Sequence, residues 1–448
     1  MAKIGVVADD LTGATTTGVL LARSKAKTAV FFDDTAAAQY EGLKDLDAVL
    51  ISSNSRPLSK EDAYQRVSKA TSVLKGAGVQ YFSKRIDTTL RGNVGTEIDA
   101  MLDTIGDNAI AVMVPAMPQS RRILVGGYSV IDNVALIRTP VAKDVRTPVK
   151  ENYIPKLIQS QSKRKVALIE LEDVLDGEAQ VAGAMRKAID GGAEILVVDA
   201  ISIDDVELIA KAAISLGRTM IAVDPGPFTA KVAFCHGLIE TEQPNIPDVK
   251  PVTGKTVLIA AGSATPVTKR QMEVLCEDDQ VRRIEVDPLA LIHGADSANA
   301  EIDRTVKQAV AMLGEAPQPK AILMETALHG DLLDLDEEDK RHGYAKGMSA
   351  ESINGGLGAI VAAVIEKVGR DKIAGLYATG GDTMVNVCYH LGVGCLEMID
   401  YVIPQTDLSF ITGKYAGLPI VGKGGLTGDD HIAEKIIERL CLEAARER

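Results

Sequence analysis

The stretch ATGGDTMVN, residues 378–386, is the part of the sequence from which the fold is most directly inferred. It follows an apolar run, 373–378, that is typical of a buried strand, and it leads into 384–391, which has the pattern of a helix. Gly380 and Gly381 can adopt backbone angles closed to other residues and leave no Cβ to obstruct a ligand. The free N–H groups at the start of the helix suit a phosphate. Many α/β proteins have such a turn only because the chain reverses there, so this stretch alone leaves both interpretations open.

A second glycine-rich turn, GKGGLTGDD at 422–430, follows another apolar run, 418–421, and precedes the last predicted helix. Two such turns in the C-terminal half favour a nucleotide site. Lys423 can neutralise a phosphate there, or extend to solvent. A carboxylate beside a phosphate is repulsive unless a cation lies between them. Asp382 therefore indicates either a bound Mg²⁺ or a helix-capping role.

Strand-like and helix-like runs alternate along the whole chain, which predicts an α/β fold of two domains with mostly parallel sheets covered by helices. We place the boundary in the proline-rich polar segment 236–252, and expect domains over 1–240 and 250–448 with a cleft between them. The alternation breaks from 118 to 148, where the glycines at 126–127 indicate a small hairpin. Strands are expected near 3–8, 28–33, 47–53, 79–86, 109–115, 165–171, 193–199, 219–224, 256–261, 282–286, 320–326, 373–378, 395–403 and 418–421.

The composition limits the class of function. Of 448 residues, 46% are apolar and 25% charged, as in an ordinary soluble α/β enzyme. A net charge of −13 argues against a general nucleic-acid-binding or membrane-binding role. The N-terminus turns acidic at once, and we see no apolar run near the roughly 20 residues of a membrane span, so a cytoplasmic protein is expected. The five cysteines and six histidines show no metal-ligand spacing, and each histidine is expected on the surface or in the core.

The first predicted strand runs directly into ADDLTGATTTG, residues 8–18. Asp9 and Asp10 therefore lie at the carboxyl end of a parallel strand, where open α/β sheets bind ligands. Either carboxylate can accept a hydroxyl proton or hold a polyol chain, and the alternative is that they cap the following helix. Because two carboxylates exceed what capping requires, we favour a functional role.

Positive charge is concentrated at two places in the N-terminal half. Arg56 follows a predicted strand, and SKRIDTTLRGNVG holds Lys84, Arg85 and Arg91 within eight residues. Arginine presents a forked pair of donors that matches a carboxylate, whereas lysine is a compact charge. Asp87 lies among these charges with neighbouring hydroxyl side chains, which suits recognition of hydroxyls and carboxylates. A solvated basic loop is the alternative.

Taken in order, ADDLTGA, SKRIDTTLRG, AGS at 261–263, TGGDT and VGKGGLTG resemble the motifs of the four-carbon acid sugar kinases over nearly the whole chain. The resemblance implies an N-terminal domain that binds a sugar acid and a C-terminal domain that binds ATP. It implies phosphorylation of the C4 hydroxyl of D-threonate, D-erythronate or a 3-oxo-tetronate, and ADDLTGATTTG is most similar to the D-threonate enzymes. Residues 224–227, DPGP, depart from the family, in which many members have a Gly-rich turn followed by Leu. This departure leaves the end of the substrate domain and the substrate choice open.

The resemblance and the neighbouring residues together predict two sites. The expected sugar-acid contacts are Asp9, Asp10, Arg56, Lys84, Arg85, Ile86, Asp87 and Arg91. The expected nucleotide contacts are Ser263, Thr379, Gly380, Gly381, Asp382, Thr383, Lys423, Gly424 and Gly425. ATP and Mg²⁺ are the implied cofactors, with the metal at Asp382. Asp10, and after it Asp87, is expected to take the proton of the attacking hydroxyl.

Two other classes of function fit the sequence less well. A regulator that binds a sugar acid or nucleotide without turnover would suit two domains, but the basic helix of a DNA-binding regulator is absent. A nicotinamide dehydrogenase requires G-x-G-x-x-G after a strand and an acidic residue about 20 positions on, which we do not find. Residues 417–423 match the glycine and lysine spacing of a P-loop, but Gly424 stands where Ser or Thr is needed. We expect no nucleic-acid or membrane partner, and a homodimer by default.

Overall fold

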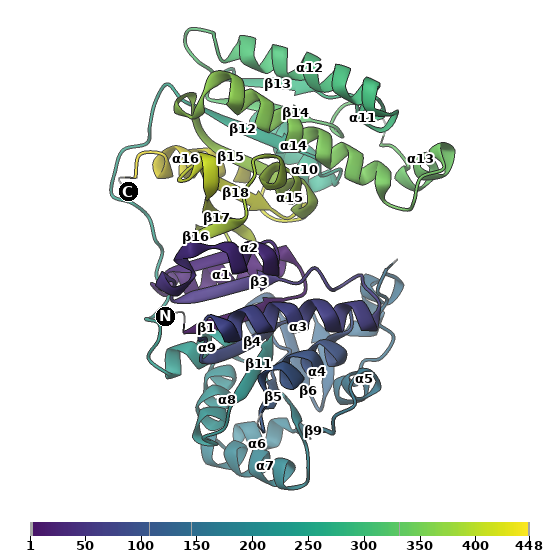
Figure 1. Cartoon of the computed structure of the whole chain (residues 1–448), viewed down its shortest axis with the longest axis vertical. Helices are drawn as coiled ribbons and strands as arrows, with labels where there is room; N and C mark the ends of the chain where they lie inside the picture. The colour runs from purple at the N-terminus through teal and green to yellow at the C-terminus, as the bar shows by residue number, and fades with distance from the viewer. Residues whose placement is uncertain (1–2, 107, 145, 331, 447–448) are drawn as a thin grey trace. The chain divides into compact units, whose positions relative to one another are not determined.

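The predicted fold class is confirmed, since the chain is an α/β protein with large, mostly parallel sheets (Figure 1). The chain divides between Pro244 and Asn245 into two compact units, here unit 1 and unit 2. The computed structural model describes all residues except 1–2, 107, 145, 331 and 447–448.

Unit 1 is built on parallel strands in the order β2-β3-β1-β4-β11-β5-β10-β9. All eight lie where apolar runs predicted them, because strands of a parallel sheet are covered on both faces and so read as continuous apolar runs. Their bounds are β1 (Ile4–Ala8), β2 (Thr28–Phe31), β3 (Ala48–Ser52), β4 (Tyr81–Arg85), β5 (Ile110–Met113), β9 (Val166–Ile169), β10 (Ile195–Val198) and β11 (Met220–Asp224).

Helices connect these strands, and their starts follow ordinary capping rules. Ser59 is the N-cap of α3, and its hydroxyl accepts the N–H of Asp62 at 3.1 Å. The helices of unit 1 are α1 (Leu11–Arg23), α2 (Asp34–Gln39), α3 (Lys60–Gly76), α4 (Val94–Ile105), α5 (Ile154–Gln161), α6 (Leu171–Leu175), α7 (Glu178–Asp190), α8 (Ile203–Ser215) and α9 (Pro227–Cys235).

The break in the alternation near 118–148 is a small antiparallel sheet of β6 (Arg122–Val125), β7 (Tyr128–Ile131) and β8 (Val134–Ala135). The predicted hairpin is therefore present, with a short third strand added. Gly126 and Gly127 form its turn with φ of 58° and 76°, which favours glycine at both positions. The buried Asp199 carboxylate accepts both of their N–H groups, at 2.6 and 2.9 Å, and so fixes the turn to the end of β10.

Unit 2 has the strand order β13-β14-β12-β15-β18-β17-β16, in which β17 runs antiparallel to both of its neighbours. β17 was not predicted. β18 continues to Lys423, so Gly422 and Lys423 belong to a strand, and the turn expected at 422–430 begins at Gly424. The bounds are β12 (Thr256–Ala261), β13 (Val281–Glu285), β14 (Ala321–Glu325), β15 (Ile373–Thr379), β16 (Cys395–Tyr401), β17 (Thr406–Ile411) and β18 (Pro419–Lys423).

One helix of unit 2 corrects an expectation. α14 has 21 residues and contains an 18-residue window with a mean hydropathy of 1.4, so by length and composition it can cross a membrane, contrary to our reading of the sequence. Half of its apolar window is buried within the protein, as in the core helix of a folded domain. The helices of unit 2 are α10 (Pro266–Leu275), α11 (Pro288–Ile292), α12 (Ala295–Met312), α13 (Leu335–His342), α14 (Met348–Val368), α15 (Gly381–His390) and α16 (Ile432–Glu443).

The strand order shows where each unit can bind a ligand. In unit 1 the chain leaves β1 toward β2 on one side and leaves β4 toward β5 on the other. In unit 2 the chain leaves β12 toward β13 and leaves β15 toward β16, again in opposite directions. Open α/β sheets bind ligands outside the carboxyl ends of strands at such switch points. The expected places are therefore the ends of β1 and β4 in unit 1, and of β12 and β15 in unit 2.

Candidate active site

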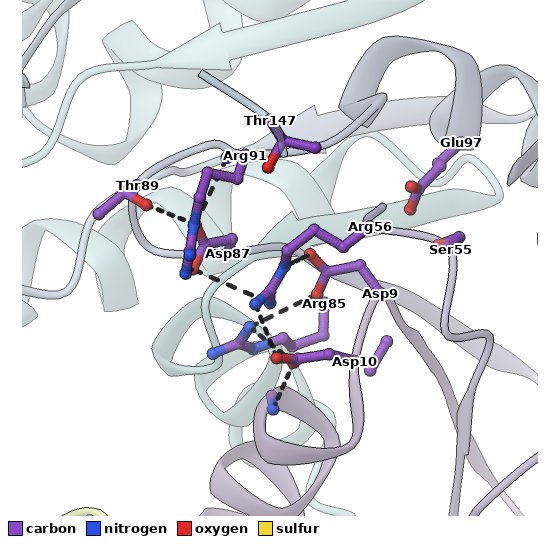
Figure 2. Close-up of polar contacts among 12 residues, drawn as sticks. Asp9, Asp10, Ser55, Arg56, Arg85, Asp87, Thr89, Arg91, Glu97 and Thr147 are labelled. Carbon is purple, nitrogen blue, oxygen red and sulfur yellow. Dashed lines mark hydrogen bonds and ion pairs between the residues drawn. The ribbon is translucent and has the colours of Figure 1, made fainter. Parts of the chain in front are cut away.

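Two carboxylates and two guanidinium groups meet at the carboxyl ends of β1 and β4 (Figure 2). Arg56 donates from Nε to Asp9 Oδ2 over 2.8 Å, and its Nη1 lies 2.7 Å from Asp10 Oδ2. Arg85 Nη1 lies 3.6 Å from Asp9 Oδ1 and 3.9 Å from Asp10 Oδ1. The backbone carbonyl of Asp9 accepts the N–H groups of Ser55 and Arg56, which fixes the loop after β3 beside β1. One forked guanidinium thus bridges both carboxylates.

Asp10 takes the capping role that the sequence left open, and it also pairs with an arginine. It is the N-cap of α1, and its Oδ1 accepts the N–H of Gly13 at 2.7 Å. Its other oxygen pairs with Arg56. A Cβ at Gly13 would overlap the Arg85 guanidinium and lie 2.7 Å from Asp10 Oδ1. The glycine in ADDLTG is therefore needed for the close approach of these groups to α1.

The proton affinities of the two adjacent carboxyls differ. Burial raises the pKa of Asp9, but the charges of Arg56, Lys84 and Arg85 outweigh burial, and the pKa falls below that of an ordinary aspartate. In Asp10, burial and then the charge of Asp9 raise the pKa, against the opposing effect of Arg56 and Arg85. Asp9 is thus the ionised partner of the arginines, and Asp10 is the more basic carboxylate.

Asp87 follows β4 and is held by its own loop. Arg91 donates from Nε to Asp87 Oδ2 at 2.7 Å and from Nη2 to Oδ1 at 3.2 Å, and the Thr89 hydroxyl donates to Oδ2 at 2.5 Å. Arg56 Nη2 lies 3.9 Å from Asp87 Oδ1, so Arg56 stands between Asp87 and the Asp9–Asp10 pair (Figure 2). Burial raises the pKa of Asp87, but the bonds to Arg91 and the charge of Arg56 lower it well below its usual range. Asp87 is therefore a firmly ionised anchor for arginine.

Two predicted contact residues lie in the interior behind this cluster. Lys84 is fully buried, with its ammonium 2.8 Å from Glu97 Oε2 and donating to the Arg85 carbonyl at 2.9 Å. The side chain of Ile86 is also buried, and its N–H donates to the Asp224 carbonyl at 3.0 Å. Both residues support the strand end that carries Arg85.

Sequence reasoning missed the partners that come from the 118–148 segment. Asp144 Oδ2 lies 3.4 Å from Arg91 Nη1, while Asp144 Oδ1 accepts the N–H of Thr147 at 2.8 Å. No motif links these residues to Arg91, because they are distant in the sequence and lie outside any regular pattern. The only feature of the sequence that could have indicated these partners is an acidic residue, Asp144, in a loop.

The departure at residues 224–227 is a tightly capped turn between β11 and α9. Asp224 accepts the N–H groups of Gly226 and Phe228 at 2.6 and 2.7 Å, and the Thr229 hydroxyl at 2.5 Å. Gly226 has a φ of 131°, which favours glycine. Burial raises the pKa of Asp224. The DPGP motif is thus a turn after β11 that is held by a buried carboxyl.

In unit 2, the turn between β15 and α15 forms a glycine-lined cradle. Gly380 has a φ of 100° and donates its N–H to the Lys423 carbonyl at 2.9 Å. The Thr383 hydroxyl donates to Asn354 Oδ1 in α14 at 2.7 Å, and a Cβ at Gly262 would lie 2.5 Å from that hydroxyl. Thr379, at the end of β15, has a buried hydroxyl without a hydrogen-bond partner among the described residues. The N–H groups of the first turn of α15 are the donors that such a cradle offers to an anion.

Ser263 and Gly425 lie beside this cradle. The Thr265 hydroxyl donates to the Gly425 carbonyl at 2.5 Å. The Thr268 hydroxyl lies 3.1 Å from the same carbonyl and 3.2 Å from Ser263 Oγ, either of which can accept its proton. A Cβ at Gly425 would lie 2.6 Å from Ser263 Oγ, and one at Gly380 would lie 3.8 Å from Ser263 Cβ. The structure therefore brings together the three strand-end turns that the sequence singled out.

The two charged residues of the predicted nucleotide site differ in their surroundings. Lys423 does not extend to solvent; it is buried, and its amine donates to the carbonyls of Gly424 and Thr427 at 2.9 and 3.2 Å. Burial lowers its pKa to about 8. The exposed Asp382 carboxylate has no hydrogen bond or ion pair within the described part of the chain, and the N-cap of α15 is Gly380. The carboxylate oxygens of Asp382 are therefore available to a cation.

Comparisons with known proteins follow the same division of the chain. Residues 4–232 match the family described as "Sugar-binding N-terminal domain", and residues 258–433 match "Nucleotide-binding C-terminal domain". The chain is 36% identical to a D-erythronate kinase of Heliobacterium modesticaldum, over 100% of this chain and 99% of that protein. It is 28% identical to a D-threonate kinase of Salmonella typhimurium, over 96% of each chain. A solved structure described as a putative tRNA synthase from Salmonella typhimurium has a TM-score of 0.80 at 20% identity, covering 97% of this chain and 99% of that one, and supports the fold alone.

Proposed function

We propose that this chain, which belongs to the four-carbon acid sugar kinases, transfers the γ-phosphoryl group of ATP to the C4 hydroxyl of D-erythronate. The kinase activity on four-carbon acid sugars follows from the family. D-erythronate is favoured because the relative at 36% identity is named for it. D-threonate is the second candidate, favoured by the resemblance of ADDLTGATTTG and by the relative at 28% identity. These aldonates differ only in stereochemistry, so few side chains can decide between them.

The observation that carries the proposal is the Asp9–Asp10 pair bridged by Arg56 at the switch point of unit 1. Arg56 and Arg85 supply positive charge for the carboxylate of a sugar acid. Asp9 Oδ1 and Arg85 Nε are buried without a hydrogen-bond partner among the described residues, which supports a bound polyol as their missing partner.

In this mechanism Asp10 accepts the proton of the C4 hydroxyl. Its raised pKa makes it the better base of the two carboxylates. The C4 oxygen then forms a bond to the γ-phosphorus as the bond to the β,γ-bridging oxygen breaks, and ADP leaves. Asp87, our second choice from the sequence, is less suited because, although burial opposes them, its bonds to Arg91 and the charge of Arg56 lower its pKa and so make it a weaker base. We assign Asp87 to positioning arginine.

Unit 2 is the proposed ATP-binding unit. The first turn of α15, from Gly381 to Thr383, offers N–H groups to the phosphates, and Ser263 offers a hydroxyl. Asp382 would hold Mg²⁺, which neutralises phosphate charge when bound. The free carboxylate of Asp382 supports this assignment, because no cationic side chain of the described residues pairs with it.

The test is ADP release from Mg²⁺-ATP with D-erythronate, D-threonate, L-threonate and a 3-oxo-tetronate. We expect turnover with D-erythronate above the others, and a loss of about 10²- to 10⁴-fold in kcat for Asp10→Asn with KM changed much less. Ser160→Ala, which removes an exposed hydroxyl from α5, is the control and should keep full turnover. Absence of ADP with all four acids would overturn the proposal, and preference for D-threonate would transfer it to the second candidate.

A further inference from the structure

Three side chains with metal-binding atoms gather in unit 2, and none belongs to the predicted nucleotide site. Glu338 and His342 lie one helical turn apart on α13, so they share a face of that helix. His293 is the C-cap of α11. One donor atom from each of the three lies within 4.8 Å of the other two. α11 and α13 are both labelled in Figure 1.

Two of the donor atoms are buried and lack a partner. Glu338 is 4% exposed, and its Oε2 has no hydrogen-bond partner among the described residues. The same holds for His342 Nε2, which lies 3.6 Å from Glu338 Oε2, beyond hydrogen-bond distance. Buried polar atoms are normally satisfied, because leaving one unpaired costs about 1–3 kcal/mol. Two such atoms facing each other indicate a shared partner.

The surrounding contacts hold the three side chains in place. Arg341 Nη1 lies 2.7 Å from Glu338 Oε1, which leaves Oε2 free and sets the orientation of the carboxylate. The Tyr344 hydroxyl donates to the Ile292 carbonyl at 3.0 Å and so joins the segment after α13 to the end of α11. The Tyr344 ring also stacks on His342, with centroids 5.3 Å apart.

The start of α14 is fixed to α13 in the same way. Asp339 accepts the N–H groups of Gly347 and Ser349 at 2.5 and 2.8 Å. The rings of His293 and His342 lie with centroids 5.0 Å apart. The donor set is thus held by contacts that need no ion, as in a preformed site.

We propose that His293, Glu338 and His342 bind a divalent transition-metal ion, Zn²⁺ in the first place. Two imidazoles and one carboxylate suit Zn²⁺, whereas Mg²⁺ and Ca²⁺ require mainly oxygen ligands. Three protein ligands leave a fourth tetrahedral position for water, and the exposed side chain of His293 gives solvent access to it. The ion would fasten α11 to α13. This site is independent of the proposed kinase reaction, because it shares no residue with it.

The test uses the full chain, stripped of metal with a chelator and then titrated with Zn²⁺ in the absence of nucleotide. We expect one equivalent of Zn²⁺ to bind and to raise the unfolding temperature. Co²⁺ in its place should give the visible absorption of a four-coordinate N/O site. His293→Ala and His342→Gln should each weaken Zn²⁺ binding by more than about tenfold, since even the loss of an outer-shell partner costs 10- to 100-fold.

His431→Ala is the matched control. His431 is exposed, and its Nδ1 lies 3.1 Å from Glu434 Oε2. Among the described residues this pair belongs to no group of three metal-binding side chains. Removal of His431 should leave Zn²⁺ affinity unchanged. The exposed position of His293 means that its substitution leaves the fold intact. The inference is overturned by the absence of saturable Zn²⁺ binding, or by Zn²⁺ binding that both site variants retain at full strength.

Discussion

Arg56 is the positive charge that Asp9, Asp10 and Asp87 share. Its guanidinium lies 2.8 Å from Asp9, 2.7 Å from Asp10 and 3.9 Å from Asp87, and the Arg56 side chain is 16% exposed. Removing one partner of a largely buried ion pair leaves an uncompensated charge, which is more costly than the pair itself was worth. Loss of Arg56 is therefore expected to destabilise this region.

We expect Arg56→Met to lower the free energy of unfolding by about 3 kcal/mol or more, because Asp9 and Asp10 lose their main counter-charge. Urea denaturation at pH 7 measures the change. Arg66→Met is the control: Arg66 is exposed on α3, and its substitution should change stability by less than about 0.5 kcal/mol. Equal losses in the two variants would mean that the Asp9–Asp10 charges are compensated elsewhere.

Asp87 makes the stability of the chain sensitive to acid. Although burial opposes it, the bonds from Arg91 and the charge of Arg56 hold the pKa of Asp87 below its value in the unfolded chain, about 3.9. Such a carboxylate contributes stability above the unfolded pKa, and the contribution is lost as the pH falls through the folded pKa. We expect the unfolding temperature of the unaltered chain to fall steeply below about pH 4, and the fall to be smaller in Asp87→Asn. An identical pH dependence in the two proteins would contradict this assignment.

The residues that meet in unit 1 show which contacts of the candidate site can be predicted from the sequence and which cannot. Asp9, Asp10 and Asp87 follow predicted strands directly and Arg85 lies near the end of one. Their meeting at one sheet edge could therefore be inferred. The burial of Lys84 against Glu97 could not, because a basic residue beside other basic residues reads as solvated until the downstream helix is placed. The contact between His293 and His342 could not be predicted either, since the two residues are far apart in the sequence and only the fold brings their rings together.

Among the elements, strands on continuous apolar runs were predicted well and the antiparallel strand β17 was missed. Its sequence, TDLSFI, is half polar, and no Gly or Asn-Gly signal marks the turn before it. Gln405 instead takes a φ of 70° at that turn. The bulge in the β16–β17 pairing between Met398 and Asp400 also breaks the alternation that would reveal a hairpin.

The glycine turns of unit 2 require residues without a side chain, because neighbouring groups lie close to the glycine backbone. A Cβ at Gly425 would lie 2.6 Å from Ser263 Oγ and 3.0 Å from Thr265 Cγ2. We expect Gly425→Ala to weaken ATP binding by about tenfold or more, corresponding to about 1.4 kcal/mol, because Ser263 must move away from the cradle. Isothermal titration with a non-hydrolysable ATP analogue measures the effect.

Gly183→Ala is the matched substitution for this experiment. Gly183 lies inside α7, where an added Cβ meets nothing within 4 Å. It should leave nucleotide affinity unchanged and stabilise the chain by about 0.5–1 kcal/mol, since alanine is the better helix former. Unchanged ATP affinity in Gly425→Ala would remove this turn from the nucleotide site.

In both units of the molecule, the motifs singled out in the sequence lie at the switch point of the unit's own sheet. The alternation of strands and helices predicts that each half is an α/β unit, but no local pattern states which strands lie side by side. The order β2-β3-β1-β4 and the order β14-β12-β15-β18 therefore had to come from the structure. Once that order is known, the motifs after β1, β4, β12 and β15 fall into two candidate sites, one in each unit.

This division predicts that each ligand responds to substitutions in one unit only. A ligand that binds the folded state raises its stability by RT ln(1 + [L]/Kd), about 2.7 kcal/mol at one hundred times Kd. In Arg85→Met we expect the rise in unfolding temperature caused by D-erythronate to disappear and the rise caused by an ATP analogue to persist, because Arg85 belongs to unit 1. In Gly425→Ala the ATP shift should shrink while the D-erythronate shift persists, and Arg66→Met should preserve both. If either site variant loses both shifts while remaining folded, the assignment of one ligand to each unit is wrong.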